Sequence, residues 1–276
     1  MKIAVLSGKG GAGKTFIASN LAASLDQAIY VDCDVEEPNG RLFLKPVDIQ
    51  QTVVAQKVPA FDPVRCTGCR KCVDLCKFNA LIFIKGTPKV FTEVCHSCGL
   101  CAMACPIGAI TEVDRPIGHV EVGRHGNTCV VTGILNTGEA SGVGVIQAAL
   151  CEANGEIVII DCPPGSACSV QESIGDADYC ILTVEPTAFG FHNFQMVYEL
   201  VKLLGKPCGV VINKMDVPYM PLETFCKEHQ IPVLLRIPYR SDLAQWISCG
   251  ELACERDQNL KESFRSIARE IGGDIQ

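Results

Sequence analysis

A glycine-rich stretch near the start of the chain has the residue types and spacing of a phosphate-binding loop. Gly8-x-x-x-x-Gly13-Lys14-Thr15 follows an apolar run and precedes apolar residues at helical spacing. Such glycines let backbone N–H groups converge on phosphate oxygens at a helix N-terminus. Lys14 is the expected cation for the β- and γ-phosphates, and Thr15 is the expected hydroxyl ligand of Mg²⁺. The alternative is a glycine-rich turn that binds no nucleotide. The predicted nucleotide-binding residues of this loop are Gly8, Lys9, Gly10, Gly11, Ala12, Gly13, Lys14, Thr15 and Phe16.

Acidic residues follow two of the predicted buried strands. The run 28–31 leads into Asp32-Cys33-Asp34, and the run 157–160 leads into Asp161-Cys162-Pro163. The carboxyl ends of parallel strands are where an open α/β sheet places its ligand chemistry. Asp161 is therefore the expected Mg²⁺ partner, and the Pro/Gly segment after it could respond to a γ-phosphate.

The loop carries a second lysine, and the string Lys9-Gly10-Gly11-x-Gly13-Lys14-Thr15 resembles the deviant phosphate loop of the MinD/ParA/Mrp family of ATPases. In that family the first lysine reaches across a nucleotide-sandwich dimer to the phosphates of the partner. The resemblance therefore implies a homodimer that forms on ATP binding, with Lys9 and Lys14 among its catalytic residues.

The same resemblance implies roles for residues outside the loop. Asp34, in a segment similar to switch I, would orient or activate the attacking water and join Thr15 and Asp161 at Mg²⁺. Asp32 would support that loop from behind. Asn213 would recognise the adenine, and Pro238 would begin the loop that closes over the base. The alternatives are that Asp34 is a capping or turn acid, and that Asn213 only caps a loop.

Eight cysteines in the middle of the chain repeat one spacing. Cys66-x-x-Cys69-x-x-Cys72-x-x-x-Cys76 recurs as Cys95-x-x-Cys98-x-x-Cys101-x-x-x-Cys105, and the two runs resemble a bacterial-type ferredoxin with two [4Fe–4S] clusters. In such a repeat the fourth cysteine of each run ligates the other cluster. Zinc is the competing interpretation of paired Cys-x-x-Cys units. The predicted ligand sets are Cys66, Cys69, Cys72 and Cys105 for the first cluster, and Cys76, Cys95, Cys98 and Cys101 for the second.

Apolar runs supply the elements that must position these residues. Buried strands are predicted at 3–6, 28–31, 157–160, 179–184, 210–213 and 232–237, and helices at 145–153 and about 192–204. Residues 47–58 are predicted to be extended, and 118–131 to form a strand or hairpin that returns to the main sheet. Apolar residues at 260–271 share one helical face, which is expected to pack on the core because its polar face is mixed in sign.

The composition excludes several classes of protein. Of the 276 residues, 48% are hydrophobic and 20% charged, which indicates a compact globule. The net charge of −7 argues against general nucleic-acid binding. The chain has no apolar run of about 18 residues, so membrane association is not expected and the predicted location is cytoplasmic. Its 18 cysteines therefore point to metal ligation or reduced thiols.

Ten of the cysteines lie outside the repeats. Cys33 and Cys162 adjoin the predicted switch acids, so they could form a thiol switch or bridge a dimer through a cluster. The alternative is that they are small buried apolar residues. Cys249 and Cys254 have the wrong spacing for the Cys-x-x-Cys pair that scaffold-type Mrp relatives use to share a cluster.

The predicted fold class is α/β: a P-loop NTPase with a doubly wound, mainly parallel sheet and an inserted small α+β ferredoxin-like domain. The ATPase domain is expected to span 1–62 and 117–276, and the insert 63–116. The expected function is ATP hydrolysis coupled through dimer switching to electron transfer, with an unknown redox or metalloprotein partner. The alternatives are a cluster carrier or metallocentre-assembly ATPase, and a redox-sensing positioning or partitioning ATPase.

Overall fold

The computed structural model describes residues 1–272, and most of them surround one large sheet. The sheet has nine strands in the order β11-β10-β9-β1-β8-β2-β7-β6-β3. The strands from β11 to β7 run parallel to one another, whereas β6 is antiparallel to both β7 and β3. The bounds are β1 Lys2–Ser7, β2 Ile29–Asp32, β3 Val47–Phe61, β6 Ile110–His125, β7 Thr128–Leu135, β8 Val158–Asp161, β9 Tyr179–Val184, β10 Cys208–Met215 and β11 Val233–Pro238.

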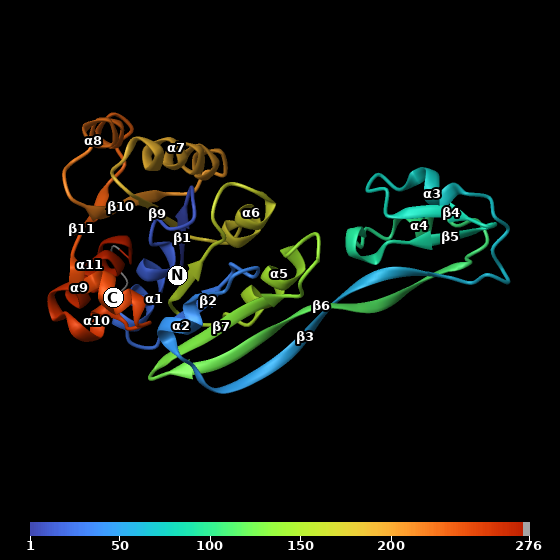
Figure 1. Ribbon diagram of the computed structural model, residues 1–276, viewed down its shortest axis with the longest axis horizontal. Helices are drawn as coiled ribbons and strands as arrows, with labels where there is room; N and C mark the ends of the chain where they lie inside the picture. Colours follow the sequence, from blue (N-terminus) through green and yellow to red (C-terminus); the bar gives the residue numbers. More distant parts are fainter. Residues whose placement is uncertain (273–276) are drawn as a thin grey trace.

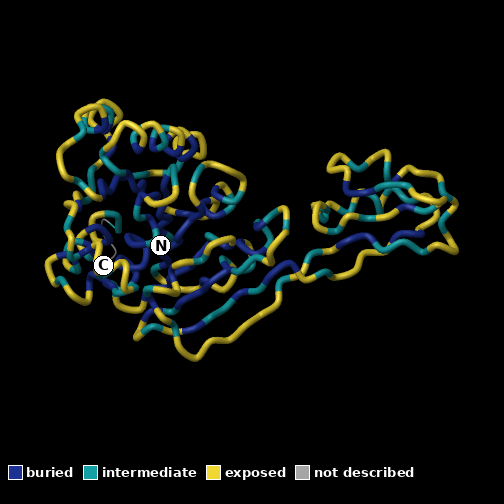
Figure 2. Tube along the Cα trace, in the orientation of Figure 1, coloured by how far each residue is buried: buried dark blue, intermediate teal, exposed yellow. Residues whose placement is uncertain are grey.

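Helices cover both faces of the sheet (Figure 1). Apolar residues of α5, α6, α7 and α8 form one core cluster with the strands, and those of α1, α2, α9, α10 and α11 form a second. The continuous apolar runs of β2 and β8 are buried throughout, as expected for strands covered on both faces (Figure 2). The predicted α/β fold with a mainly parallel sheet is therefore confirmed. The helix bounds are α1 Lys14–Ser24, α2 Gly40–Leu44, α5 Val143–Cys151, α6 Cys168–Ile174, α7 Ala188–Leu203, α8 Met220–Glu228, α9 Ser241–Ser248, α10 Ala253–Arg256 and α11 Gln258–Gly272.

Helices α7 and α11 test two predictions that were made from the spacing of apolar residues. Helix α7 begins at Ala188, earlier than the predicted start near 192, because the Thr187 side chain accepts a hydrogen bond of 3.0 Å from the Gly190 N–H and caps the helix. Helix α11 packs on the core as predicted. Its Phe264 is fully buried and meets the Phe16 ring edge-on at 6.4 Å between centroids.

Strands β3 and β6 extend beyond the main body as a two-stranded ribbon (Figure 1). Strand β7 ends at Leu135, which pairs with Gly118, so residues 110–117 of β6 pair with β3 alone. We call this ribbon, residues 54–61 and 110–117, the arm. It carries a small outer lobe, residues 62–109, which contains α3 Lys71–Leu75, β4 Leu81–Ile84, β5 Thr87–Val90, a 3₁₀ turn Thr92–Val94 and α4 Leu100–Met103.

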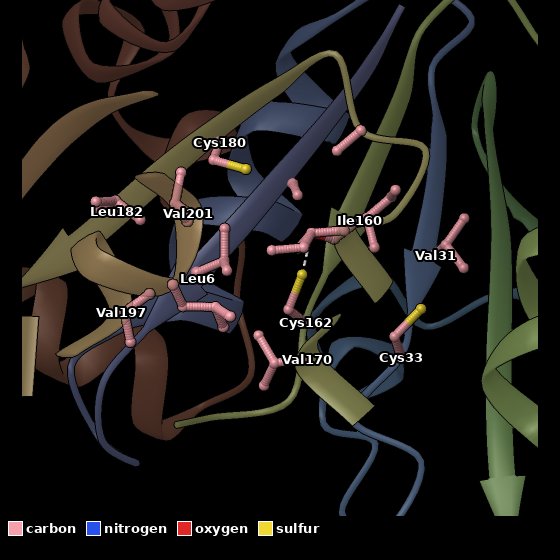
Figure 3. Packing of buried hydrophobic residues seen from close by; sticks show 14 of the residues in the cluster. Leu6, Val31, Cys33, Ile160, Cys162, Val170, Cys180, Leu182, Val197 and Val201 are labelled. Atoms are coloured by element: carbon pink, nitrogen blue, oxygen red, sulfur yellow. Dashed lines mark hydrogen bonds between the residues drawn. The ribbon is translucent and has the colours of Figure 1, made fainter. Parts of the chain in front are cut away.

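Buried cysteines outside the repeats belong to the apolar core. Cys33, Cys162 and Cys180 are fully buried and point among residues such as Leu6 and Val170 (Figure 3). Burial raises the pKa of the Cys33 and Cys162 thiols, so both are held in the neutral form. Their environment fits the interpretation of small apolar side chains. No helix within residues 1–272 has the length and apolar character needed to cross a bilayer.

Two neighbouring threonines should respond in opposite ways to loss of the hydroxyl. Thr187→Ala removes the α7 cap and should cost about 1 kcal/mol, or about 2–4 °C in apparent melting temperature. Thr183→Val should leave the melting temperature equal or raise it, because the buried Thr183 hydroxyl has no hydrogen-bond partner within the described residues. The measurement is thermal unfolding of anaerobically purified protein. Thr187→Ser, which keeps the cap, is the control, and equal losses in Thr183→Val and Thr187→Ala would contradict the assignment.

Candidate functional site

The glycine-rich loop connects the end of β1 to the start of α1. Gly11 and Gly13 have φ values of 81° and 96°, in the left-handed region that favours glycine. A Cβ on Gly13 would also lie 2.1 Å from the Asn213 amide nitrogen, and one on Gly8 would lie 2.1 Å from the Asn193 carbonyl oxygen. These glycines therefore bring the loop close to β10 and α7, and α1 begins at Lys14 as the phosphate-loop motif requires.

The Lys14 ammonium faces the acids at the ends of β2 and β8. Its Nζ lies 2.7 Å from Asp161 Oδ1 and 3.5 Å from Asp34 Oδ2. Burial alone would lower the pKa of Lys14, but the Asp161, Asp34 and Asp32 carboxylates outweigh it and raise that pKa. The structure thus brings Lys14 together with Asp34 and Asp161, two of the predicted site residues. It joins the lysine directly to the acid that was predicted to serve Mg²⁺.

Two buried residues behind this group hold the acids in place. The Tyr30 hydroxyl donates to Asp161 Oδ2 at 2.8 Å, and the Gly40 and Asp34 N–H groups donate to Asp32 at 2.9 and 3.1 Å. Burial and the nearby Asp161 raise the pKa of Asp32. Asp32 therefore supports the loop from behind, as predicted. Tyr30 was missed, although a hydroxyl in a fully buried strand signals a polar partner.

Two cavities flank the loop and share Gly11, Lys14 and Thr15 in their walls. The outer cavity, about 290 Å³, includes Phe16, Asn213 and Pro238, so the predicted base-contacting residues border it. The acid cavity, about 460 Å³, includes Gly10, Asp34 and Pro163. A triphosphate bound along the loop would have its base beside the outer cavity and its terminal phosphate beside the acid cavity.

A network of lysines ties the loop to the ends of β9 and β10. Asn213 Nδ2 donates to the Ala12 carbonyl at 2.9 Å, and Lys214 Nζ donates to the Gly11 carbonyl at 2.7 Å. Glu185 accepts from Lys214 at 2.6 Å and from Lys9 at 2.5 Å through its two carboxylate oxygens. Burial would raise the pKa of Glu185, but the two lysines lower it. Glu185 and Lys214 were not predicted, although both follow apolar strands, where ligand chemistry collects.

The outer lobe gathers the repeated cysteines around two further cavities. Cys66, Cys69, Cys72 and Cys105 line one, and Cys76, Cys95, Cys98 and Cys101 line the other, which Cys72 also borders. The structure therefore brings together each predicted ligand set. Residues with a left-handed backbone conformation, such as Gly68 and Gly99, turn the chain between neighbouring cysteines.

One of the predicted ligand thiols, Cys105, has surroundings that favour the thiolate, whereas burial raises the pKa of Cys72 and of Cys101. Cys105 Sγ accepts a hydrogen bond of 3.2 Å from the Ala109 N–H. Burial would raise the pKa of Cys105, but backbone N–H groups of residues 107–110 outweigh it and lower that pKa. No group of three or more His, Cys, Asp or Glu side chains in the described chain could hold a metal ion. The cysteines of the two predicted sets instead border two separate cavities.

A family model described as the CobQ/CobB/MinD/ParA nucleotide binding domain matches residues 3–253. The chain belongs to this family. The membership confirms the resemblance to MinD and ParA ATPases that the two loop lysines indicated. Nucleotide binding is therefore a property of the family to which the chain belongs.

Individual relatives agree with this assignment. The chain is 27% identical over 277 residues to an uncharacterized protein of Methanocaldococcus jannaschii, covering 98% of this chain and 96% of that one. It shares its fold with the septum site-determining protein MinD of Pyrococcus horikoshii, solved with Mg-ADP, at a TM-score of 0.59, 18% identity, and coverage of 98% and 95% of the two chains. An uncharacterized ferredoxin of M. jannaschii is 44% identical over 50 residues, which are 17% of this chain and 33% of the ferredoxin.

Substitutions at two glycines of the loop should distinguish an effect on folding from an effect on nucleotide binding. A Cβ on Gly10 would meet no atom within 4 Å and would stand at the acid cavity, whereas one on Gly13 would collide with Asn213. Gly10→Ala should leave the melting temperature of the nucleotide-free protein unchanged and weaken ADP binding by roughly tenfold or more, about 1.4 kcal/mol. Gly13→Ala should lower both the melting temperature and the affinity for ADP. Calorimetric titration and thermal unfolding measure the two effects, and wild-type ADP affinity in Gly10→Ala would show that phosphates do not approach this backbone.

Proposed function

We propose that this chain is an ATP-hydrolysing iron–sulfur protein in which nucleotide state is coupled to electron transfer. The observation that carries the proposal is the joint presence of two kinds of site in one chain. Cavities flank the phosphate loop, and two cavities of the outer lobe are each lined by one predicted set of four cysteines. When bound there, [4Fe–4S] clusters would each accept and release one electron. The proposed ferredoxin domain spans 63–116 and the ATPase domain spans 1–62 and 117–276.

At the phosphate loop, binding of ATP would require Lys14 to exchange partners. Its Nζ now bonds Asp161, and it would turn to the β- and γ-phosphates while Thr15, Asp34 and Asp161 hold Mg²⁺. Asp34 is the better placed acid to orient a water, because it borders the acid cavity and is only partly buried. Asn213 and Pro238 would contact the base from the outer cavity.

Lys9 would act on a second copy of the chain. In the single chain its ammonium is paired with Glu185 and lies 5.2 Å from the centre of the Phe189 ring. A homodimer formed on ATP would require Lys9 to leave Glu185 for a phosphate of the partner. The ion pair is thus a resting position for the lysine, and Glu185 would restrain dimer formation in the absence of nucleotide.

The iron content tests whether the two cysteine sets hold iron–sulfur clusters. Protein purified without oxygen should contain about eight iron and eight sulfide per chain, because each set of four cysteines would hold one four-iron cluster. Cys98→Ser should lose about half of the iron, whereas Cys151→Ser, which removes an exposed cysteine outside the repeats, should lose none. Stoichiometric zinc, or an equal loss in both variants, would refute the cluster assignment. Reduction potentials that differ between ADP and a non-hydrolysable ATP analogue would support coupling.

The Lys9–Glu185 ion pair predicts opposite effects of two variants on dimer formation. With an ATP analogue, Glu185→Gln should tighten the dimer about fivefold, about 1 kcal/mol, because Lys9 no longer leaves a full ion pair. Lys9→Ala should abolish the dimer while leaving ATP bound. Analytical ultracentrifugation measures both, with Lys227→Ala as a control that removes an exposed lysine of α8. A Lys9→Ala protein that still dimerises would exclude the proposed role of this lysine.

The exposure of two predicted ligand cysteines favours the alternative function of a cluster carrier. Cys69 and Cys98 are exposed on the outer lobe, as would suit a cluster that is handed on. Incubation with an apo acceptor protein distinguishes the two functions. Clusters that serve electron transfer should stay with the chain, whereas cargo clusters should move to the acceptor.

A further inference from the structure

The loop between β7 and α5, residues 136–142, has one end at the acid cavity. Gly142 borders that cavity together with Asp34 and Pro163. A Cβ on Gly142 would lie 2.5 Å from Val35, and the Val35 carbonyl accepts a hydrogen bond of 2.9 Å from the Leu135 N–H. The segment that follows Asp34 is therefore packed directly against both ends of the loop, so a shift of that segment must be felt there.

The middle of the same loop is bound to the arm. Arg115 of β6 donates two hydrogen bonds of 2.7 Å to the carboxylate of Glu139. The side chains are 20% and 8% exposed, so this bidentate pair is partly shielded from water. Asn136 adds a backbone hydrogen bond of 2.8 Å to the Ile117 carbonyl. The loop thus holds the arm at the point where it leaves the main sheet.

Arg115 also reaches the outer lobe. Its Nη2 lies 4.0 Å from Glu93 Oε1, and Glu93 precedes the predicted ligand Cys95 by two residues. The guanidinium therefore stands between a carboxylate of the main body and the segment that carries Cys95. Its positive charge is compensated mainly by Glu139, because Glu93 is more distant and 59% exposed.

A second contact joins the same regions independently. Ser97, between Cys95 and Cys98, donates a hydrogen bond of 3.2 Å to the Gln56 side chain on the arm. Gln56 in turn packs beside Gly144 at the start of α5, where a Cβ would lie 3.3 Å from its amide nitrogen. Both contacts run from the segment 136–144 to the loop 93–98, and neither involves the other cysteine cavity.

We propose that loop 136–142 relays the state of the acid cavity to the Cys76, Cys95, Cys98 and Cys101 site, with the Arg115–Glu139 pair as its adjustable charge. The inference rests on the proposed coupling of nucleotide to electron transfer and assigns it to named residues. When a γ-phosphate displaces the segment after Asp34, the loop moves and the carboxylate of Glu139 withdraws from Arg115. The unpaired guanidinium then favours the more negative, reduced state of a cluster beside it.

Two substitutions of the pair should act in opposite directions. Glu139→Gln leaves Arg115 uncompensated, so the reduction potential at this site should be higher than in the ADP-bound wild type and independent of nucleotide. Arg115→Gln removes the positive charge, so the potential should be lower and also independent of nucleotide. The measurement is a redox titration of the iron-loaded protein followed by electron paramagnetic resonance, with ADP and with a non-hydrolysable ATP analogue.

Asp114→Asn is the matched control. Asp114 lies next to Arg115 on the arm and pairs with Lys57 at 2.9 Å, but the pair is exposed and does not touch loop 136–142. This variant should keep the nucleotide-dependent difference of the wild type. A second measurement, hydrogen exchange of residues 93–98, should respond to the ATP analogue in the wild type and in Asp114→Asn, and lose that response in Glu139→Gln.

The outcomes separate the relay from the proposal on which it rests. A Glu139→Gln protein that keeps the wild-type difference in potential and in exchange overturns the relay alone. Wild-type potentials that are the same with ADP and the ATP analogue overturn the proposed coupling and the relay together. Loss of the difference in Glu139→Gln and Arg115→Gln, with opposite displacements of the potential, supports the relay.

Discussion

One buried ammonium group and the carboxylates around it organise the molecule. Lys14 begins α1, Asp161 ends β8 and Asp34 lies two residues after β2, so a single ion-pair cluster joins the first helix to two central strands. Charges removed from water require compensation, which is why Tyr30, Gly40 and the backbone of residue 34 all direct donors at the acids. A loop that must admit a polyanion is in this way held in shape by anions of the protein itself.

This arrangement makes ligand binding an exchange of partners. In the proposed function, an entering phosphate would compete with Asp161 for Lys14, and a phosphate on a second chain would compete with Glu185 for Lys9. Because Asp161 ends β8 and Glu185 directly follows β9, the exchange would act where these strands pass into the loops beyond them. The binding energy is thereby divided between holding the nucleotide and moving the protein, which is the condition for two conformations to bind it unequally.

The sequence was most informative where local chemistry dictates structure. Glycines with positive φ, apolar runs buried on two faces and regularly spaced cysteines predicted the phosphate loop, the parallel sheet and the grouping of thiols. Tyr30 and Glu185 were not predicted because their partners are distant in the sequence. Tyr30 and Asp161 are 131 positions apart, and Glu185 and Lys9 are 176 positions apart. The start of α7 was placed late because a single threonine cap, rather than apolar periodicity, fixes it. The loop 136–142 lies in a glycine-rich stretch that matches no motif, and its connection through Glu139 depends on the arm.

The position of the arm has a consequence for how such a chain could arise. The two points where the backbone passes into the outer lobe are neighbours, since Phe61 pairs with Ile110 and the Asp62 N–H donates to the Ala109 carbonyl at 2.9 Å. In topological terms the lobe is an enlarged hairpin turn at an outer edge of the sheet. Replacing it with a tight turn, or exchanging it for another small module, would leave every parallel crossover of the sheet untouched.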